Sequence, residues 1–171
     1  APIVTVLNSD DVFDAPRLER ALSAFGDPRL VLLGTGVRLI DAKGLRIDGP
    51  KHHWNAWVSG MEDVLGRTGS MTSTLCAGNL FLTTSNFVFR RSLYDALGGF
   101  SDLRYCHDYD FALRAVVAHP DGVRIDLGER SLAYRLHGRN TISEDRQRPN
   151  VETFDLLLRM LPSLFSGPPE A

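Results

Sequence analysis

The chain has 171 residues, of which 43% are hydrophobic and 23% charged, as is typical of one folded domain with its own core. The formal net charge of −2 and the lack of a long Lys/Arg run argue against electrostatic binding of nucleic acid. Two cysteines, Cys76 and Cys106, without a CxxC pair, indicate neither a disulfide framework nor a zinc site and favour a cytoplasmic setting.

The apolar segments are too short for a membrane span. None approaches the ~20 residues that a transmembrane helix needs. We therefore expect a soluble, cytoplasmic chain, and attachment to the inner face of the membrane would have to come from a longer parent protein.

The first half of the chain predicts strands, one helix and a long loop. The apolar, β-branched run at residues 3–7 predicts a central strand that is covered on both faces. Asp14, as a capping carboxylate, and Pro16 predict the start of a helix that ends at Gly26. The apolar face expected for this helix consists of Leu18, Ala21, Leu22 and Phe25.

Residues 30–40 predict another strand region, interrupted by Gly34 and Gly36, and a turn at residues 41–44 leads into a hairpin strand at residues 45–47. The pattern then weakens. Residues 49–78 predict a long loop with one short helix.

The second half predicts regular elements up to its end. Residues 81–90 read as a strand, residues 92–97 as a helix ended by Gly98 and Gly99, and residues 109–117 as an amphipathic helix stopped by Pro120. Strands are expected at residues 123–127 and 132–136. A terminal helix and tail occupy residues 144–171, and prolines from Pro162 onward are expected to end the order. The apolar face predicted for this helix consists of Val151, Phe154, Leu158 and Leu161.

Several polar residues lie where a strand or helix begins or ends, and each permits two interpretations. Asn8, Asp10 and Asp11 follow a strand and could hold a hard divalent cation through oxygen ligands, or they form a polar turn with a helix cap. Asp108 could be a general base or a helix N-cap. His107, beside it, could tune the charge of Asp108 or bind substrate, or it could be a partly exposed loop histidine.

Other candidates have similar alternatives. His137 could complete a metal site, although Mg²⁺ and Mn²⁺ prefer oxygen and a single histidine is usually structural. Trp54 and Trp57 could stack on a sugar, or they form part of the core.

Five segments, in order, carry a resemblance to a known family. They are NSDDVFDAPRLERAL, VRLIDAKG, FVFRRSLYDALGGF, HDYDFALR and YRLHGRNTI, within residues 3–143. The chain resembles glycosyltransferase family 2, the inverting enzymes with a GT-A fold. The resemblance implies an α/β fold, with a GT-A-like (Rossmann-like) mixed sheet flanked by helices, in a single domain over residues 1–171. It also implies that the family's N-terminal nucleotide-binding part is missing from this sheet.

The resemblance also implies roles for individual residues. Asp10 would bind Mg²⁺ or Mn²⁺ with Asn8, Asp11 and His137, and Arg135 would lie with Asp10 and His137 near the donor diphosphate. Asp108 would be the catalytic base. The acceptor side would consist of Gly98, Gly99, Phe100, His107 and Trp54.

The implied reaction transfers a sugar from a nucleotide-sugar donor to a saccharide or lipid-linked acceptor in polysaccharide biosynthesis. Without the nucleotide-binding part, we expect weak or no transferase activity from the isolated chain. An open sheet edge would then pair with that missing part or with a second copy, as a homodimer. A different hypothesis is a non-catalytic binding or oligomerisation module derived from the GT-A fold. A metal-dependent phosphoryl or diphosphate hydrolase is a third.

Overall fold

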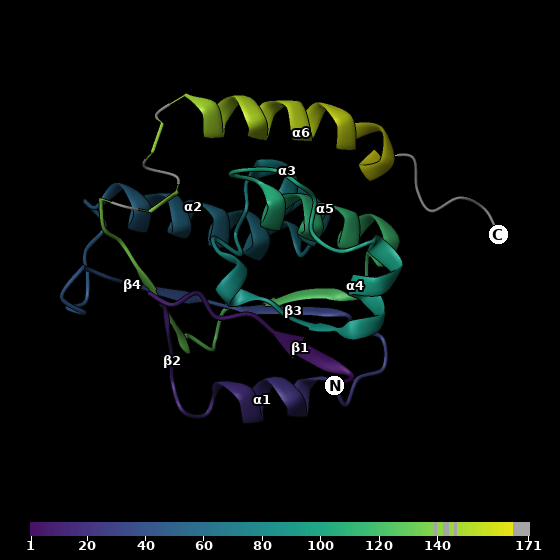
Figure 1. Ribbon diagram of the computed structural model, residues 1–171, viewed down its shortest axis with the longest axis horizontal. Helices are drawn as coiled ribbons and strands as arrows, with labels where there is room; N and C mark the ends of the chain where they lie inside the picture. Colours follow the sequence, from purple (N-terminus) through teal and green to yellow (C-terminus); the bar gives the residue numbers. More distant parts are fainter. Residues whose placement is uncertain (139, 142–143, 146, 166–171) are drawn as a thin grey trace.

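The computed structural model describes residues 1–138, 140–141, 144–145 and 147–165. In this part of the chain, seven strands form two mixed sheets, and six α-helices pack around them (Figure 1). The larger sheet has the order β1 (Ile3–Thr5), β5 (Val88–Arg90), β3 (Leu32–Thr35) and β6 (Val123–Asp126). The smaller has the order β2 (Val12–Phe13), β7 (Leu132–Arg135) and β4 (Val37–Ile40). The predicted α/β class is thus confirmed.

Each sheet contains both parallel and antiparallel pairs. In the larger sheet, β5 runs antiparallel to both β1 and β3, whereas β3 and β6 are parallel. In the smaller sheet, β7 pairs antiparallel with β2 and parallel with β4. The predicted strand region at residues 30–40 divides at Gly36 into β3 and β4, so one apolar segment contributes to both sheets.

The helices form layers on either side of the larger sheet (Figure 1). Helix α1 (Arg17–Ala24) lies on one side, and α2 (His53–Thr68), α3 (Met71–Ala77), α4 (Arg91–Leu97) and α5 (His107–Ala118) lie on the other. Helix α6 (Arg148–Phe165) is the outermost element, beyond α3 and α5. Among the described helices, none is long and apolar enough to cross a membrane.

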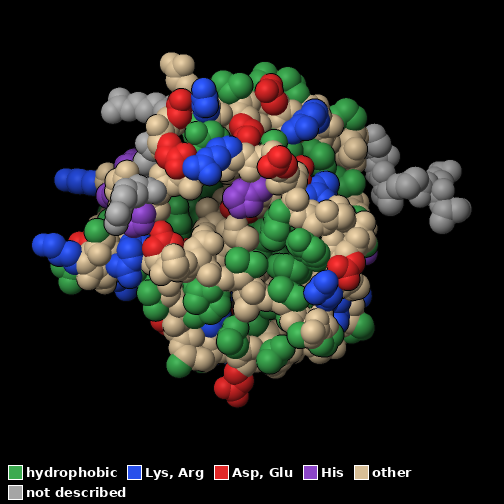
Figure 2. Space-filling view, viewed as in Figure 1, with side chains coloured by type: hydrophobic (Ala, Val, Ile, Leu, Met, Phe, Trp, Pro, Cys, Tyr) green, Lys and Arg blue, Asp and Glu red, His purple; other side chains and the backbone are tan. Residues whose placement is uncertain are grey.

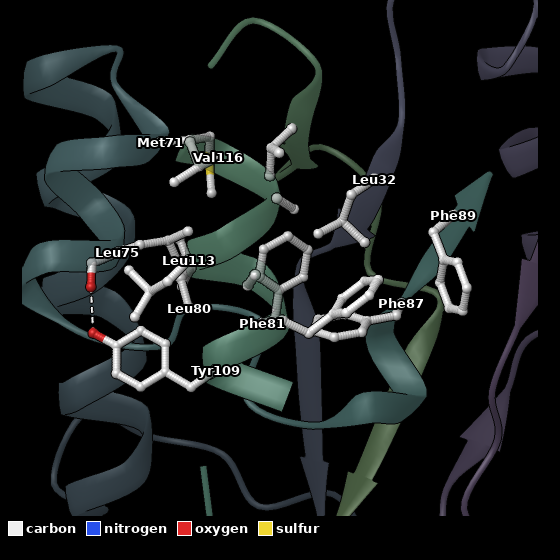
Figure 3. Close-up of a cluster of buried hydrophobic side chains, with 14 of the residues drawn as sticks. Leu32, Met71, Leu75, Leu80, Phe81, Phe87, Phe89, Tyr109, Leu113 and Val116 are labelled. Atoms are coloured by element: carbon white, nitrogen blue, oxygen red, sulfur yellow. Dashed lines mark hydrogen bonds between the residues drawn. The ribbon is translucent and has the colours of Figure 1, made fainter. Parts of the chain in front are cut away.

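The main core lies between the larger sheet and the helices α3 and α5. Figure 3 shows Leu32 of the sheet facing Phe81, Phe87 and the side chains of α5. Phe81 and Phe87 are fully buried and meet edge to face, with ring centroids 4.9 Å apart. The Tyr109 hydroxyl donates a hydrogen bond to the Leu75 carbonyl, which ties α5 to α3 (Figure 3). This packing fixes the N-terminus of α5, where Asp108 and His107 lie.

The position predicted for the first strand is wrong. The run at residues 3–7 is expected in the centre of a sheet, but β1 is a half-buried edge strand of three residues. Among the described strands it pairs with β5 alone, through Ile3–Arg90, Val4–Phe89 and Thr5–Val88. An apolar run indicates that a strand can be buried, but its neighbours are decided by long-range pairing.

Helix α1 forms where expected, but its cap and its apolar face differ from the prediction. The Asp14 carboxylate does not cap the helix, because it binds the Arg38 guanidinium, with Oδ1 2.8 Å from Nη2. Ala21 and Phe25 are buried against the sheet, whereas Leu18 and Leu22 are exposed. The helix therefore packs through a narrower stripe than its sequence predicts.

Most of residues 49–78 are helical, contrary to the predicted loop with one short helix. They form α2 and α3, and Val58 is the buried residue of α2. Gly69, with φ 60°, ends α2, and the Ser70 hydroxyl accepts a hydrogen bond from Ser73 N to cap α3. This glycine and serine were the local signals for two helices, and the weak apolar periodicity obscured them.

The predicted strand at residues 81–90 is also shorter than expected. Strand β5 forms only the last three residues of the predicted range, and a 3₁₀ turn at Thr84–Asn86 precedes the strand. The buried Asn86 side chain accepts from Thr35 N and donates to Thr35 O, so it takes the place of a strand partner at the end of β3. Leu82 has φ 68°, an uncommon conformation for a residue with a branched side chain.

Helix α6 also differs from the prediction, because Pro162 lies within it and does not end it. Its buried residues include Leu156, while the four residues of the predicted apolar face are exposed. The predicted termination at residues 168–169 lies outside the described residues.

Candidate functional site

The turn after β1 and the loop after β7 come together at one end of the smaller sheet. Asp10 lies in the turn, and its Oδ2 is 3.0 Å from Nε2 of His137, which follows β7. Both side chains are partly buried. The pair joins residues 127 positions apart in the chain, and it brings a carboxylate and an imidazole to the same point, as the sequence motifs predict.

Asn140 fixes the loop that carries His137. Its Oδ1 accepts from His137 N at 2.6 Å, and its Nδ2 donates to Arg135 O at 2.9 Å. Asn140 is buried, so these two hydrogen bonds are protected from water. The backbone from Arg135 to His137 is therefore held by the Asn140 side chain.

The side chains of Asp11 and Arg135 form hydrogen bonds with the backbone where the turn after β1 meets β7. Asp11 is buried, and its Oδ1 accepts from Arg135 N at 3.0 Å. Burial raises the pKa of the Asp11 carboxyl, against the lowering effect of hydrogen bonds from Ser85, Arg135 and Thr83. The Arg135 Nε donates to Asp10 O at 2.8 Å, and its Nη1 donates to the carbonyl of Asp41. The two residues thus hold the turn on β7.

Asp108 lies in the first turn of α5 and is 7% exposed. Its Oδ1 accepts a hydrogen bond from Tyr109 N at 2.6 Å, and the Asn79 side chain also hydrogen-bonds the carboxylate. Burial raises the pKa of Asp108, and the charge of His107 and these hydrogen bonds oppose the increase. A carboxyl with a raised pKa is suited to accept a proton in catalysis.

His107 precedes Asp108 and is partly buried. Its Nε2 is 3.2 Å from the Thr84 hydroxyl, and its ring meets Phe100 edge to face, at 6.1 Å between centroids. His107 is therefore partly exposed, as the alternative interpretation predicts, but the predicted position in a loop is wrong. His107 belongs to α5, and Thr84 holds it beside Asp108.

A cavity of about 790 Å³ joins these groups. A volume of this order accommodates a small-molecule ligand. Of the residues predicted for a site, those that line it are Asn8, Asp10, Trp54, Trp57, His107 and Asp108. The sequence motifs at residues 8–10 and 107–108 therefore face a common space.

Two tryptophans of α2 form one wall of the cavity. Trp54 and Trp57 meet edge to face, with ring centroids 6.1 Å apart, and Trp57 is 36% exposed. A Cβ atom at Gly78 would come 2.8 Å from Cζ2 of Trp57, so glycine leaves room for the indole. Exposed aromatic faces on a cavity wall are suited to stacking on the apolar face of a sugar.

The glycine pair and Phe100 lie outside the lining of this cavity. Gly98 and Gly99 end α4, with φ values of 73° and 81°. Phe100 packs in the core against Phe87 and Phe111. These residues contact α5, because Phe100 packs on Phe111 and Gly99 O accepts a hydrogen bond from Arg114.

The cavity also contains residues to which the sequence analysis assigns no role. Asn79, Leu82, Thr84 and Tyr105 line it, together with Tyr134 and Asn140 of the segment YRLHGRNTI. Asn79 Oδ1 is buried without a hydrogen-bond partner among the described residues. Burial and the nearby carboxylates of Asp11, Asp108 and Asp10 raise the pKa of Tyr134. Asn79, Leu82, Thr84 and Tyr105 lie outside the quoted motifs, and no periodic pattern distinguishes them.

The residues suited to hold a divalent cation are few. Across the described residues, no three His, Cys, Asp or Glu side chains gather as metal ligands. Asp10 and His137 form a pair, and Asn8 lies in the same turn. Mg²⁺ is commonly held by one or two carboxylates together with substrate phosphates, so this donor set fits a cation that a bound diphosphate would complete.

Comparison with protein-family models found no match to the chain, and a search of curated proteins found no relative.

Proposed function

We propose that the protein is an inverting glycosyltransferase with a GT-A-like fold, which transfers a sugar from a nucleotide-sugar donor to a saccharide or lipid-linked acceptor. The observation that carries the proposal is the shared cavity. Asp10 and Asp108, which are 98 residues apart by their numbers, both line it, together with Trp54 and Trp57. Glycosyl transfer needs this combination of a diphosphate-binding end, a base and a sugar-binding wall.

In the proposed reaction, Asp108 is the general base. It takes the proton of an acceptor hydroxyl, the hydroxyl oxygen forms a bond to the anomeric carbon, and the bond to the nucleotide diphosphate breaks. Burial favours the protonated form of Asp108 and so increases its affinity for this proton. A single displacement inverts the anomeric configuration.

The Asp10 end of the cavity is proposed to bind the diphosphate. Asp10, Asn8 and His137 would hold Mg²⁺ or Mn²⁺, which when bound supplies positive charge to the departing diphosphate. Asp11 and Arg135 serve the site by fixing the turn and the loop. His107 and Trp54, which line the cavity, are proposed to bind the acceptor. Gly98, Gly99 and Phe100 do not line the cavity, and their proposed part is to hold α5, on which Phe100 packs.

Calorimetric titration of the chain with UDP, GDP and their sugar conjugates tests the donor site, with and without Mn²⁺. We expect Mn²⁺-dependent binding of one nucleotide, lost in Asp10→Ala. The matched control is Asp48→Ala, because Asp48 is an exposed carboxylate that pairs with Arg46 and does not line the cavity. Binding that is unchanged in Asp10→Ala contradicts the proposed donor site.

A second candidate is a saccharide-binding module without catalytic activity. The exposed face of Trp57 and the absence of a three-residue metal cluster among the described residues favour it. This candidate predicts oligosaccharide binding without Mn²⁺ or nucleotide, weakened in Trp57→Ala and unchanged in Asp10→Ala. The transferase proposal predicts Mn²⁺-dependent nucleotide binding and, in keeping with the weak activity expected of this chain alone, at most slow release of nucleoside diphosphate when donor, acceptor and Mn²⁺ are combined. NMR of that product gives the anomeric configuration.

A further inference from the structure

The segment that leads into α5 forms a large part of the cavity wall. Residues 104–109 all line the cavity, and His107 and Asp108 belong to this segment. Helix α6, which Figure 1 shows beyond α5, contributes Asn150 and Thr153 to the same wall. The segment before α5 and the first turns of α6 therefore meet at one side of the cavity.

Glu152 of α6 binds the backbone of this segment. Its Oε1 accepts a hydrogen bond from Arg104 N at 3.0 Å, and its Oε2 accepts from Tyr105 N at 2.6 Å and from Cys106 N at 2.8 Å. Residues 104–106 precede the first turn of α5, so their N–H groups have no acceptor within that helix. One carboxylate thus satisfies three consecutive backbone donors.

The hydrogen bonds of Glu152 differ from those of the carboxylates around it. Figure 2 shows acidic and basic side chains close together over the part of the molecule where α6 lies in Figure 1. The Arg104 guanidinium donates to both carboxylate oxygens of Glu144, and Arg148 pairs with Asp145. These contacts join side chain to side chain. Glu152 instead makes charge-assisted hydrogen bonds to the backbone, so it fixes the course of the chain itself.

The same segment is held at a second point on α6 and at one point on α3. The Sγ atom of Cys106, a buried residue, is 3.3 Å from Oγ1 of Thr153 on α6. Three residues farther along, the Tyr109 hydroxyl donates to a backbone carbonyl of α3. Asp108 lies between these two points of attachment. Its place in the cavity therefore depends on α6 at one end of the segment and on α3 at the other.

We propose that Glu152 is a positioning residue of the candidate site, which fixes residues 104–106 and through them places His107 and Asp108 in the cavity. Glu152 is not one of the described residues that line the cavity, so it acts through the segment that it binds. The inference rests on the proposed function for the role of Asp108 as the base. It deepens that function, because a base must lie within hydrogen-bond reach of the acceptor hydroxyl.

The pKa of Asp108 reports the position of its carboxyl. Burial raises this pKa, while the charge of His107 and hydrogen bonds to the carboxylate lower it. Burial and the charge of Asp108 both raise the pKa values of Cys106 and Tyr134, which are its other titratable neighbours. Release of residues 104–106 would let water reach the carboxyl. The pKa of Asp108 would then fall toward its ordinary value of 3.8.

The test compares the pKa of Asp108 among folded variants, by NMR titration of the side-chain carboxyl carbon, which Asp108→Asn assigns. Glu152→Ala removes all three hydrogen bonds. Glu152→Gln removes the charge but keeps a carbonyl oxygen for the two amides that Oε2 accepts from. The matched control is Glu144→Ala, which removes a carboxylate bound to the Arg104 side chain and leaves the backbone hydrogen bonds. If Glu152→Ala fails to fold, Glu152→Asp replaces it, because it keeps the charge on a side chain shorter by one methylene.

We expect the pKa of Asp108 to fall in Glu152→Ala, and the amides of residues 105–107 to exchange hydrogen about 10–100-fold faster. Both quantities should stay near the wild-type values in Glu152→Gln and Glu144→Ala. An unchanged pKa in folded Glu152→Ala overturns the inference. So does an equal fall in Glu152→Gln, since the effect would then come from charge alone. A wild-type chain that binds no nucleotide contradicts the proposed function only, because this comparison uses no ligand.

Discussion

Arg17 is a buried cation that joins α1 to both sheets, and its removal is expected to destabilise the fold. It is 2% exposed. Its Nη1 donates to the Thr35 hydroxyl at 2.7 Å and to the Ser131 hydroxyl at 3.4 Å, and its Nη2 donates to the Asn86 backbone and side-chain oxygens, both at 3.1 Å. The guanidinium lies 4.6 Å from the centroid of the Phe13 ring. Burial lowers the pKa of Arg17 to about 10, so it remains charged at neutral pH.

The expected magnitude follows from two opposing effects. Arg17→Ala leaves a void of several methylene groups, which costs about 2–5 kcal/mol for long buried side chains. It also leaves oxygens of Asn86 and Ser131 without this donor, at about 1–3 kcal/mol for each unsatisfied group. Removal of the buried charge returns part of this loss. We expect a net decrease of about 3–5 kcal/mol in the free energy of unfolding, and about 1–3 kcal/mol for Arg17→Met, which fills the space.

Urea unfolding, followed by tryptophan fluorescence and circular dichroism, measures this change. A loss of about 3–5 kcal/mol corresponds to a decrease in Tm of roughly 6–20 °C for a chain of this length. The control is Arg20→Ala on the same helix, because the Arg20 side chain is 60% exposed and its ion pair with Glu129 is expected to contribute less than about 1 kcal/mol. A decrease below about 1 kcal/mol in Arg17→Ala refutes the reasoning.

Three further substitutions test the candidate site. Because burial raises the pKa of Asp108 above its ordinary value of 3.8, the folded protein holds this proton more tightly than the unfolded chain, and stability falls as the pH rises through the raised pKa. Asparagine has no proton to lose, so Asp108→Asn removes this dependence on pH. We expect the free energy of unfolding of Asp108→Asn to exceed that of the wild type by about 0.5–2 kcal/mol at pH 7, and by less near pH 3. Asn140→Ala frees the loop that carries His137, and calorimetry should show Mn²⁺-dependent nucleotide binding weakened by about 10–100-fold. Gly78→Ala displaces the Trp57 indole, and stronger acrylamide quenching of fluorescence with weaker oligosaccharide binding should result.

Each of these expectations has a control and a contrary outcome. For Asp108→Asn, the matched control is Asp102→Asn, because Asp102 is an exposed aspartate. Equal dependence of stability on pH in the two variants would contradict the burial argument. For Asn140→Ala, unchanged nucleotide affinity in a folded protein would show that the loop needs no such support. For Gly78→Ala, the control is Gly66→Ala on α2, where no heavy atom lies within 4 Å of an added Cβ, and identical quenching in both would count against contact with Trp57.

Local sequence determined those elements whose signals lie within a few residues. The apolar residues of α5 repeat at helical intervals, so the helix and the position of Asp108 in its first turn could both be predicted. Gly98 likewise marks the end of α4, because its left-handed conformation suits glycine. The proposal that Asp10 and His137 are neighbours came from the resemblance of residues 8–11 and 134–142 to glycosyltransferase family 2, and local sequence alone did not provide it.

Tertiary structure decided where these elements lie and which side chains share a site. The sequence shows that β1 and α6 contain apolar residues, but it carries no information about which elements they contact. In the structure, β1 is an edge strand, and the predicted apolar face of α6 is exposed. The pairing of Asp10 with His137 spans 127 positions, and it depends on how β7 places the following loop beside the turn after β1. Contacts at this distance result from the packing of the whole chain, because no segment contains both partners.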